Sequence, residues 1–194
     1  EPLPDTPVLL RRSLNPAADP ATFSVYSNDR WNLAPGVFEA HAPTGSLNFA
    51  AVPPQYRAAV KRYFWCLINA DTPRRQRGAN VSRLALHTIT CSFLPIRDFV
   101  LWLNASGIQG FGEVRREDLE RYLTDVLAAD VSDSKKARLL GEVVRFWADR
   151  KMLPEDIRMS AAPPWDGEYP AELLGAPSSS GVNRTPRINT DTID

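Results

Sequence analysis

The spacing of apolar residues between positions 111 and 154 constrains the fold of this chain more than any other feature. Within this stretch, apolar residues recur every three or four positions in two separate runs. That period predicts two amphipathic helices, over residues 116–129 and 134–152, which would bury their apolar faces in a helical bundle. The faces are formed by Leu119, Tyr122, Leu123, Val126 and Leu127 in the first run and by Leu139, Leu140, Val143, Val144, Phe146 and Trp147 in the second.

The starts of these two helices carry unequal capping signals. Ser132 or Asp133 is a favourable N-cap for the second helix. Arg115 precedes the first helix and is a poor N-cap, so that start is less well capped. Glu117 and Asp118 in its first turn still favour the helix, because the helix dipole attracts anions there.

Two further helices are expected upstream. The first begins at Pro54, since proline suits the first helical position, and stops before Pro73. The second runs from about Asn80 to Asn104, with Gly107 beyond its end and Pro95 inside it as the site of a kink or a break. The apolar faces are Tyr56, Val60, Phe64, Leu67 and Ile68 in the first helix, and Leu84, Ile89, Phe93, Ile96, Phe99, Trp102 and Leu103 in the second.

Outside the helical body of residues 53–154 the chain changes character. Residues 1–52 begin with a stretch rich in Pro and Ala, expected to be a mobile arm, and continue with short β-like pieces that form either a hairpin or an irregular collar. Residues 155–194 are expected to be an extended linker, apart from a short helix at Pro170–Leu174. The β-like pieces are Phe23–Tyr26, Trp31–Leu33 and Leu47–Phe49.

Composition narrows the class of protein. The apolar fraction of 43% is enough for a core, and 23 Lys and Arg balance 23 Asp and Glu, which argues against a histone-like protein. Because there is no signal peptide and no apolar run of about 18 residues, we expect a soluble, cytoplasmic protein. Cys66 and Cys91 have no second Cys or His at metal-ligand spacing, so we expect buried free thiols.

The overall neutrality hides an uneven distribution of charge. Residues 53–98 hold eight basic and two acidic residues, and residues 132–151 hold six basic and three acidic residues. Residues 111–130 have a net charge of −3, and both tails are also acidic. A basic patch divided between two helices is an electrostatic footprint of nucleic-acid binding, although Arg and Lys also solvate the outside of any bundle.

Three motifs follow one another along the helical body. The first is the end of a helix before Gly107, with Ile96, Phe99, Trp102 and Leu103. The second, at residues 115–123, reads Arg-Arg-Glu-Asp-Leu-Glu-Arg-Tyr-Leu. The third, at residues 132–139, reads Ser-Asp-Ser-Lys-Lys-Ala-Arg-Leu and is followed by Arg-Phe-Trp at 145–147 and Arg-Lys-Met-Leu at 150–153. In this order and spacing they resemble the N-terminal core-binding domain of tyrosine recombinases, the phage-integrase family, in a transposon-borne, actinobacterial-type subgroup. The resemblance covers about residues 28–188.

This resemblance implies an all-α, four-helix SAM-like core-binding bundle with a small irregular or β N-terminal collar and an extended C-terminal tether. Such a domain forms one half of a C-shaped clamp on duplex DNA, and the catalytic domain of the same recombinase, which would begin where this chain ends, forms the other half. We expect a monomer off DNA and no membrane partner. Arg and Lys would hold phosphates and Asn80 and His87 would read base edges; the expected contacts are Arg74, Arg75, Arg77, Asn80, Arg83, His87, Lys135, Lys136, Arg138 and Arg145.

The chemistry of the family is not expected from this chain alone. Its members cut DNA with a Tyr nucleophile and a cluster of Arg, Lys and His that includes a His-x-x-Arg pair, which stabilises the transition state and transfers protons. The two histidines, His41 and His87, are not followed by Arg at the third position, and the five tyrosines fit core or turn positions. The sequence has no P-loop, dinucleotide motif or metal cluster, so we expect no catalysis and no cofactor.

Two alternatives stay open. In the first, the chain is a non-catalytic helical interaction module, such as the remnant of a mobile element, and its apolar grooves bind a partner protein. In the second, it is a piece of a complete recombinase.

Overall fold

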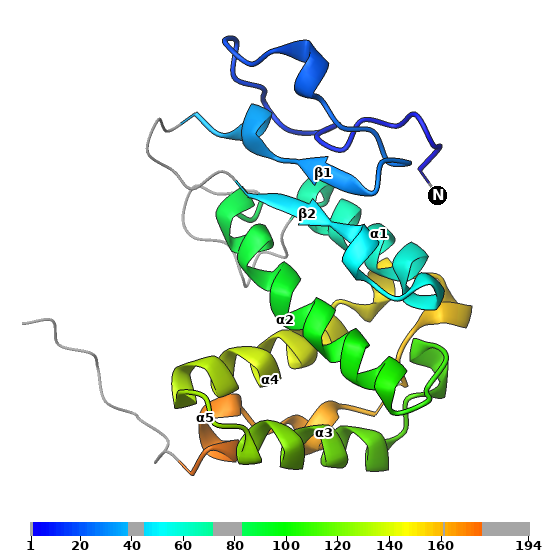
Figure 1. Ribbon diagram of the computed structural model, residues 1–194, viewed down its shortest axis with the longest axis vertical. Coiled ribbons are helices and arrows are strands. Elements are labelled where there is room, and N and C mark those ends of the chain that lie inside the picture. The colour runs from blue at the N-terminus through cyan, green and yellow to red at the C-terminus, as the bar shows by residue number, and fades with distance from the viewer. Residues whose placement is uncertain (1, 39–44, 72–82, 161, 176–194) are drawn as a thin grey trace, which may run out of the picture.

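The computed structural model describes residues 2–38, 45–71, 83–160 and 162–175. Within these ranges five α-helices and one two-stranded sheet form an elongated molecule, with the sheet and the N-terminal segment at one end and α3 at the other (Figure 1). The predicted all-α character is confirmed. The elements are β1 Arg30–Asn32, β2 Ser46–Asn48, α1 Pro54–Asn69, α2 Leu86–Ala105, α3 Arg116–Ala128, α4 Asp133–Ala148 and α5 Pro170–Leu173.

The first helix, α1, begins at Pro54 as predicted, because the fixed φ of proline suits the first helical turn. It ends at Asn69, whose side-chain Nδ2 donates to the carbonyl of Val8 at 2.9 Å. The helix therefore stops where Asn69 turns to the N-terminal segment, ahead of Pro73, which lies outside the described residues. The predicted apolar stripe is buried in full: Tyr56, Val60, Phe64, Leu67 and Ile68.

The second helix, α2, begins later than predicted. Leu86 is its first residue, and Ala85 before it is extended, with φ −61° and ψ 140°. The predicted start at Asn80 lies outside the described residues, but Leu84 is non-helical, so its apolar side chain was wrongly placed on the helix. Pro95 lies inside α2, which continues through it without a break.

The end of α2 is a Schellman motif. Gly107 has φ +81°, a left-handed conformation that glycine adopts without a Cβ penalty. Its N–H donates to the carbonyl of Asn104 and the N–H of Ile108 donates to the carbonyl of Leu103, both at 3.1 Å. Gly107 therefore has the predicted C-terminal role.

The helical hairpin of α3 and α4 is confirmed, with shorter limits than expected. The carboxylate of Asp118 accepts the backbone N–H of Arg115 at 2.9 Å, which supplies the cap that Arg115 itself lacks. Ser132 is the N-cap of α4 and accepts the N–H of Lys135 at 3.4 Å. Because α4 ends at Ala148, the last predicted turn is a separate 3-10 helix, η6 Arg150–Met152.

The N-terminal segment packs against the helices instead of forming a mobile arm. Val8 is fully buried, and Pro7 forms a β-bridge with Val25. Strands β1 and β2 pair antiparallel with Trp31 opposite Leu47, which confirms the hairpin alternative for those pieces. The lack of a sequence period in this segment thus reflects an irregular backbone and not an absence of contacts.

Aromatic side chains join this N-terminal region to the helices in one core. Trp31 from β1 lies 4.5 Å, ring centre to ring centre, from Phe49, and Phe49 lies 5.3 Å from Phe93 on α2. Phe93 in turn contacts Phe64 on α1 at 5.3 Å. Each pair has the edge-to-face geometry that aromatic rings prefer. The collar and the bundle are therefore packed as one unit.

Residues 155–175 fold back across α3 and α4, so the extended linker expected from residue 155 is wrong for this part. Trp165 is buried, and its Nε1 donates to the carbonyl of Leu119 at 3.1 Å. Asp166 pairs with Arg116 at 2.7 Å. Trp165 and Asp166 both have positive φ, within the Pro-Pro-Trp-Asp-Gly segment at 163–167 whose composition predicts a turn. The predicted short helix is present as α5, and residues 176–194 lie outside the described residues.

Candidate nucleic-acid interface

The ten predicted DNA contacts fall into three groups. Arg74, Arg75, Arg77 and Asn80 lie outside the described residues. His87 and Arg138 meet at Cys91 of α2, and Lys135 lies beside Arg138 at the start of α4. The remaining three side chains form hydrogen bonds or ion pairs with other parts of the molecule: Arg83, Lys136 and Arg145.

The junction between α2 and α4 is built on Pro95. Proline has no N–H, so the carbonyl of Cys91, four residues earlier, loses its helical partner. Arg138 from α4 fills that position, because its Nη2 donates to the carbonyl of Cys91 at 2.5 Å. One turn before, His87 Nε2 lies 3.5 Å from the sulfur of Cys91. Cys91 thereby brings together the two groups that the sequence placed on separate helices.

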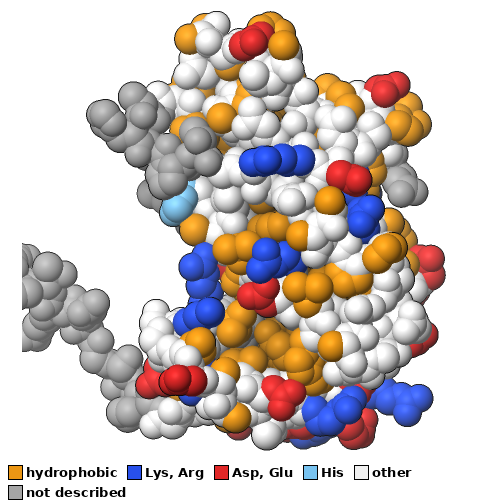
Figure 2. Space-filling model, viewed as in Figure 1, with side chains coloured by type: hydrophobic (Ala, Val, Ile, Leu, Met, Phe, Trp, Pro, Cys, Tyr) orange, Lys and Arg blue, Asp and Glu red, His pale blue; other side chains and the backbone are white. Residues whose placement is uncertain are grey.

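Lys135 extends this junction on α4. Its side chain is exposed, and it lines a cavity of about 290 Å³ between α2 and α4 together with Arg138. The same cavity holds Arg97, whose Nη2 lies 2.8 Å from the carboxylate of Asp98, and an apolar wall. Figure 2 shows Lys and Arg side chains along the left edge of the molecule, beside a hollow lined by hydrophobic side chains. The wall consists of Leu94, Pro95 and Leu139.

Lys136 and Arg145 are directed away from this edge. Lys136 Nζ donates to the carbonyl of Leu127 at 2.7 Å and so satisfies the C-terminal end of α3. Arg145 is half-buried; its Nη1 donates to Ser92 Oγ at 3.4 Å, and its Nε lies 3.8 Å from Asp149. The geometry gives both residues a role in joining helices, which a count of charges does not reveal.

Arg83 belongs to a separate cluster near the end of α1. Its Nη2 lies 3.4 Å from the carboxylate of Asp71, and Arg11 Nη2 lies 3.7 Å from the other oxygen of the same group. Arg12 is close by, because its Nη2 donates to the carbonyl of Leu84 at 2.8 Å; burial and the positive charge of Arg83 lower the pKa of Arg12 to about 10. Arg11 and Arg12 come from the N-terminal segment, so a basic cluster forms between segments far apart in the sequence.

Sequence reasoning missed Arg97, Arg11 and Arg12 as candidate site residues. Arg97 is ten positions after His87 and so about 80° around α2 from it, and it is the cavity that brings Arg97 beside Lys135 and Arg138. Arg11 and Arg12 lie in a stretch with no period, and only the fold brings them to α1. Their contribution was therefore not predictable from spacing.

The tyrosines lie in the core or in turns, as predicted. Tyr56, Tyr63 and Tyr122 are buried, and burial raises the pKa of Tyr56 to about 12 and that of Tyr63 well above its usual value. Tyr26 is half-buried, and Tyr169 is exposed in the turn before α5. The raised pKa values do not favour a role for these buried hydroxyls as nucleophiles.

Cys66 and Cys91 are free thiols, both only half-buried, and burial raises the pKa of Cys66. Among the described residues, no three His, Cys, Asp or Glu side chains are grouped as metal ligands. In the same part of the chain, no helix has the length and apolar character needed to cross a membrane.

No family model, no curated protein and no solved structure matches this chain. The side chains at the α2–α4 junction are therefore the main indication of function. That junction offers cationic donors, an exposed imidazole and a neighbouring cavity with one apolar wall. Such a set can bind an anionic polymer by charge and contact an edge of a base.

Proposed function

We propose that the chain binds duplex DNA through the edge where α2 and α4 begin. The observation that carries this proposal is that His87 and Arg138, about fifty positions apart in sequence, meet at Cys91, while Lys135 lines a cavity together with Arg138. A basic patch assembled from two helices is an electrostatic footprint of nucleic-acid binding.

The pairing of the cations supports this location. On α3, Arg116 lies 2.7 Å from the carboxylate of Asp166 and Arg121 lies 2.5 Å from that of Asp118, so these charges are neutralised within the protein. Arg138 instead donates to a neutral carbonyl. Lys135 has no hydrogen bond or ion pair from its ammonium group to any described residue. The positive charge of the α2–α4 edge is thus available to an external anion.

Each side chain would have a distinct task. Lys135 would hold a phosphate as a compact point charge, whereas the planar fork of Arg138 has donors to spare after one is used by Cys91. His87, exposed in the first turn of α2, would contact a phosphate or a base edge.

The finer proposal is that this DNA-binding unit is the core-binding part of a tyrosine recombinase. Its support is the order of the motifs together with four main helices, α1 to α4, in the expected order, although α2 begins later and α4 ends earlier than expected. Strand cleavage would then depend on a catalytic domain that supplies the Tyr nucleophile and the His-x-x-Arg pair. Sequencing the encoding DNA past the codon for Asp194 tests this directly, because a reading frame without those motifs contradicts it.

DNA binding is tested by the salt dependence of the affinity for a duplex. Each phosphate neutralised contributes about −0.9 to the slope of log affinity against log salt, so Lys135→Ala should reduce the steepness by about 0.9. Lys151→Ala is the matched control, since it removes the same group from η6, which follows the far end of α4; the helix rises about 20 Å between Lys135 and Ala148. Equal slopes for the two variants would contradict the assignment of this edge.

One observation favours protein binding as a second candidate. Leu94 and Leu101, seven residues apart and thus on the same side of α2, are 52% and 41% exposed. Leu94 also lines the cavity beside Lys135. If the chain retards no duplex in an electrophoretic mobility shift assay at low salt, binding of an apolar segment of a partner protein in this groove becomes the better-supported function.

A further inference from the structure

Two arginines from distant parts of the chain hold one carboxylate between them. Asp71 follows the end of α1; Arg11 Nη2 lies 3.7 Å from its Oδ2, and Arg83 Nη2 lies 3.4 Å from its Oδ1. Each guanidinium therefore faces one oxygen of the group. Arg83 Nε, in addition, is buried and has no hydrogen-bond partner among the described residues. The arrangement has more donors than a single carboxylate satisfies.

A third arginine adds positive charge behind this pair. Arg12 Nε donates to the carbonyl of Ile68 at 2.6 Å, and its Nη2 donates to the carbonyl of Leu84 at 2.8 Å. Arg12 thereby joins the end of α1 to the residues just before α2, and so holds the neighbouring Arg83 near the end of α1. The charge of Arg83 contributes to the lowered pKa of Arg12, which shows that the two cations repel one another. One carboxylate among three guanidinium groups leaves a local excess of positive charge.

The main chain fixes Arg11 at this position independently of its side chain. Its backbone N–H donates to Asn69 Oδ1 at 2.9 Å, and Asn69 Nδ2 donates to the carbonyl of Val8 at 2.9 Å. Val8 is fully buried, so the N-terminal segment is held firmly beside α1. The Arg11 side chain, about half exposed, is then free to contact a ligand.

We propose that Arg11 and Arg83 form a second phosphate site of the DNA interface, in which Asp71 occupies the place of the phosphate until DNA binds. This inference rests on the proposed DNA binding. A phosphodiester has one negative charge and two free oxygens, as the carboxylate of Asp71 does, so it fits between the same two guanidinium groups. Asp71 is 46% exposed and is hydrated when it is displaced.

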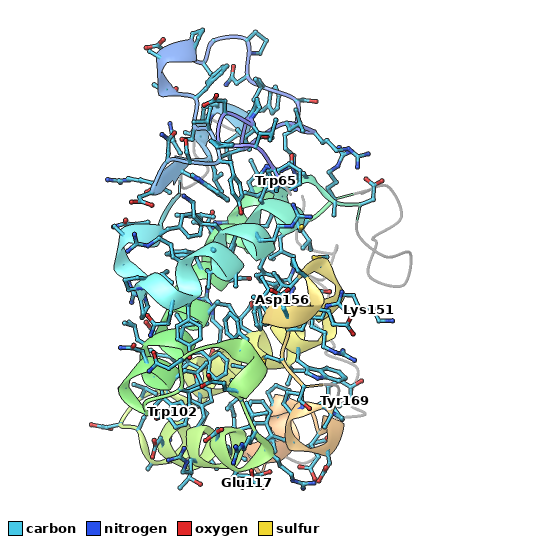
Figure 3. The ribbon with its side chains drawn as sticks, turned by 90° about the vertical axis from the view of Figure 1, so that its right-hand side faces the viewer. Trp65, Trp102, Glu117, Lys151, Asp156 and Tyr169 are labelled. Carbon is cyan, nitrogen blue, oxygen red and sulfur yellow. The ribbon has the colours of Figure 1, made fainter. Side chains whose placement is uncertain are left out.

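Removing the competing carboxylate should therefore strengthen DNA binding. Asp71→Asn frees both arginines, and because two exposed ion pairs no longer have to be broken, we expect the affinity for a duplex to rise about three- to tenfold. Glu117→Gln is the matched control: it changes the net charge equally, but Glu117 lies on α3 at the opposite end of the molecule from Trp65 of α1 (Figure 3). It should change the affinity less than twofold.

Arg11→Gln tests the other half of the site. The steepness of the salt dependence should fall by up to about 0.9, and the gain from Asp71→Asn should disappear in the double variant. The fold is expected to survive, because the hydrogen bond of the Arg11 main chain to Asn69 is retained. Equal thermal midpoints of wild type and variant verify this.

The outcomes separate this inference from the proposed function. If Lys135→Ala reduces the salt dependence while Asp71→Asn acts no differently from Glu117→Gln, the second site is overturned and DNA binding stands. If the wild type binds no duplex at any salt concentration, both are overturned. A gain confined to Asp71→Asn that Arg11→Gln abolishes establishes the site.

Discussion

Arg138 and Pro95 should be energetically coupled, because the arginine replaces a donor that the proline removed. In the wild-type chain, Arg138→Ala leaves the carbonyl of Cys91 without the bond of 2.5 Å that it now accepts. We expect the free energy of unfolding to fall by about 1–1.5 kcal/mol. The loss lies at the lower end for a charged donor, because Arg138 is exposed and water replaces part of the bond.

Pro95→Ala restores an N–H at position 95. Proline in a helix interior costs about 3 kcal/mol relative to alanine. The lost burial of two ring carbons offsets about 1.6 kcal/mol of this, at about 0.8 kcal/mol per CH₂. The single substitution should therefore raise the free energy of unfolding by about 1 kcal/mol. In this background Arg138→Ala should cost at most about 0.5 kcal/mol, since the carbonyl of Cys91 has regained its helical donor.

Urea unfolding of the wild type, the two single variants and the double variant measures the coupling. Tryptophan fluorescence and circular dichroism should give the same transition, with equal m values for all four proteins. We expect a coupling energy of about 1 kcal/mol. Lys135→Ala, which removes a neighbouring cation without a backbone bond, should cost the same in both backgrounds. Additivity of Arg138→Ala and Pro95→Ala within about 0.3 kcal/mol would refute the reasoning.

Three further outcomes are expected. Trp165→Ala should destabilise the protein by about 3 kcal/mol, because it empties a buried site and removes the hydrogen bond to the carbonyl of Leu119; a loss under about 1 kcal/mol in urea unfolding would show that residues 155–175 are not docked. Burial raises the pKa of Asp118, but hydrogen bonds from Arg115 N–H and Arg121 outweigh it and hold the pKa below the ordinary 3.8. Its stabilising effect is thus present above pH 3.8 and is lost as the pH falls through the lower folded pKa. Asp118→Asn should therefore cost about 0.5–1 kcal/mol at pH 7 and progressively less as the pH falls below 3.8, and a pH-independent difference would contradict this. Gly107→Ala should cost about 1–2 kcal/mol, entirely from φ +81°, because no atom lies within 4 Å of the added Cβ; an unchanged thermal midpoint would contradict it.

The helical body was largely predictable because its signals are local. Pro54 marks the start of α1, Ser132 caps α4 and Gly107 follows α2, each through the conformation of its own backbone. The apolar periods of α3 and α4 likewise follow from which faces are buried. The start of α2 differs from the prediction because of a contact distant in sequence: Leu84 stays outside the helix, and its carbonyl accepts a hydrogen bond from Arg12.

The flanking segments were not predictable from local signals. The packing of residues 155–175 depends on Trp165 and Asp166 adopting positive φ, which is tolerated by Asp but uncommon for a bulky residue such as Trp. Trp165 then reaches a site between elements that the sequence does not place side by side. The N-terminal segment is similar, since Val8 and Asn69 are joined only in the folded molecule.

The candidate site was predictable in its charge but not in its contacts. Basic residues on α2 and α4 were expected to meet, and His87 and Arg138 do meet at Cys91. Whether a given cation faces outward depends on its nearest carbonyl or carboxylate. Lys136 and Arg145 have such partners inside the bundle, which no count of charges distinguishes from an exposed position.

The most direct test of the account is the affinity of the wild-type chain for duplex DNA as a function of salt. Lys135 and Arg138 alone would neutralise two phosphates, so log affinity should fall with log salt along a line with a slope of about −2 or steeper. A Lys135→Ala slope less steep by about 0.9 should accompany it. Absence of binding at low salt, or binding that does not change with salt, would contradict the central claim.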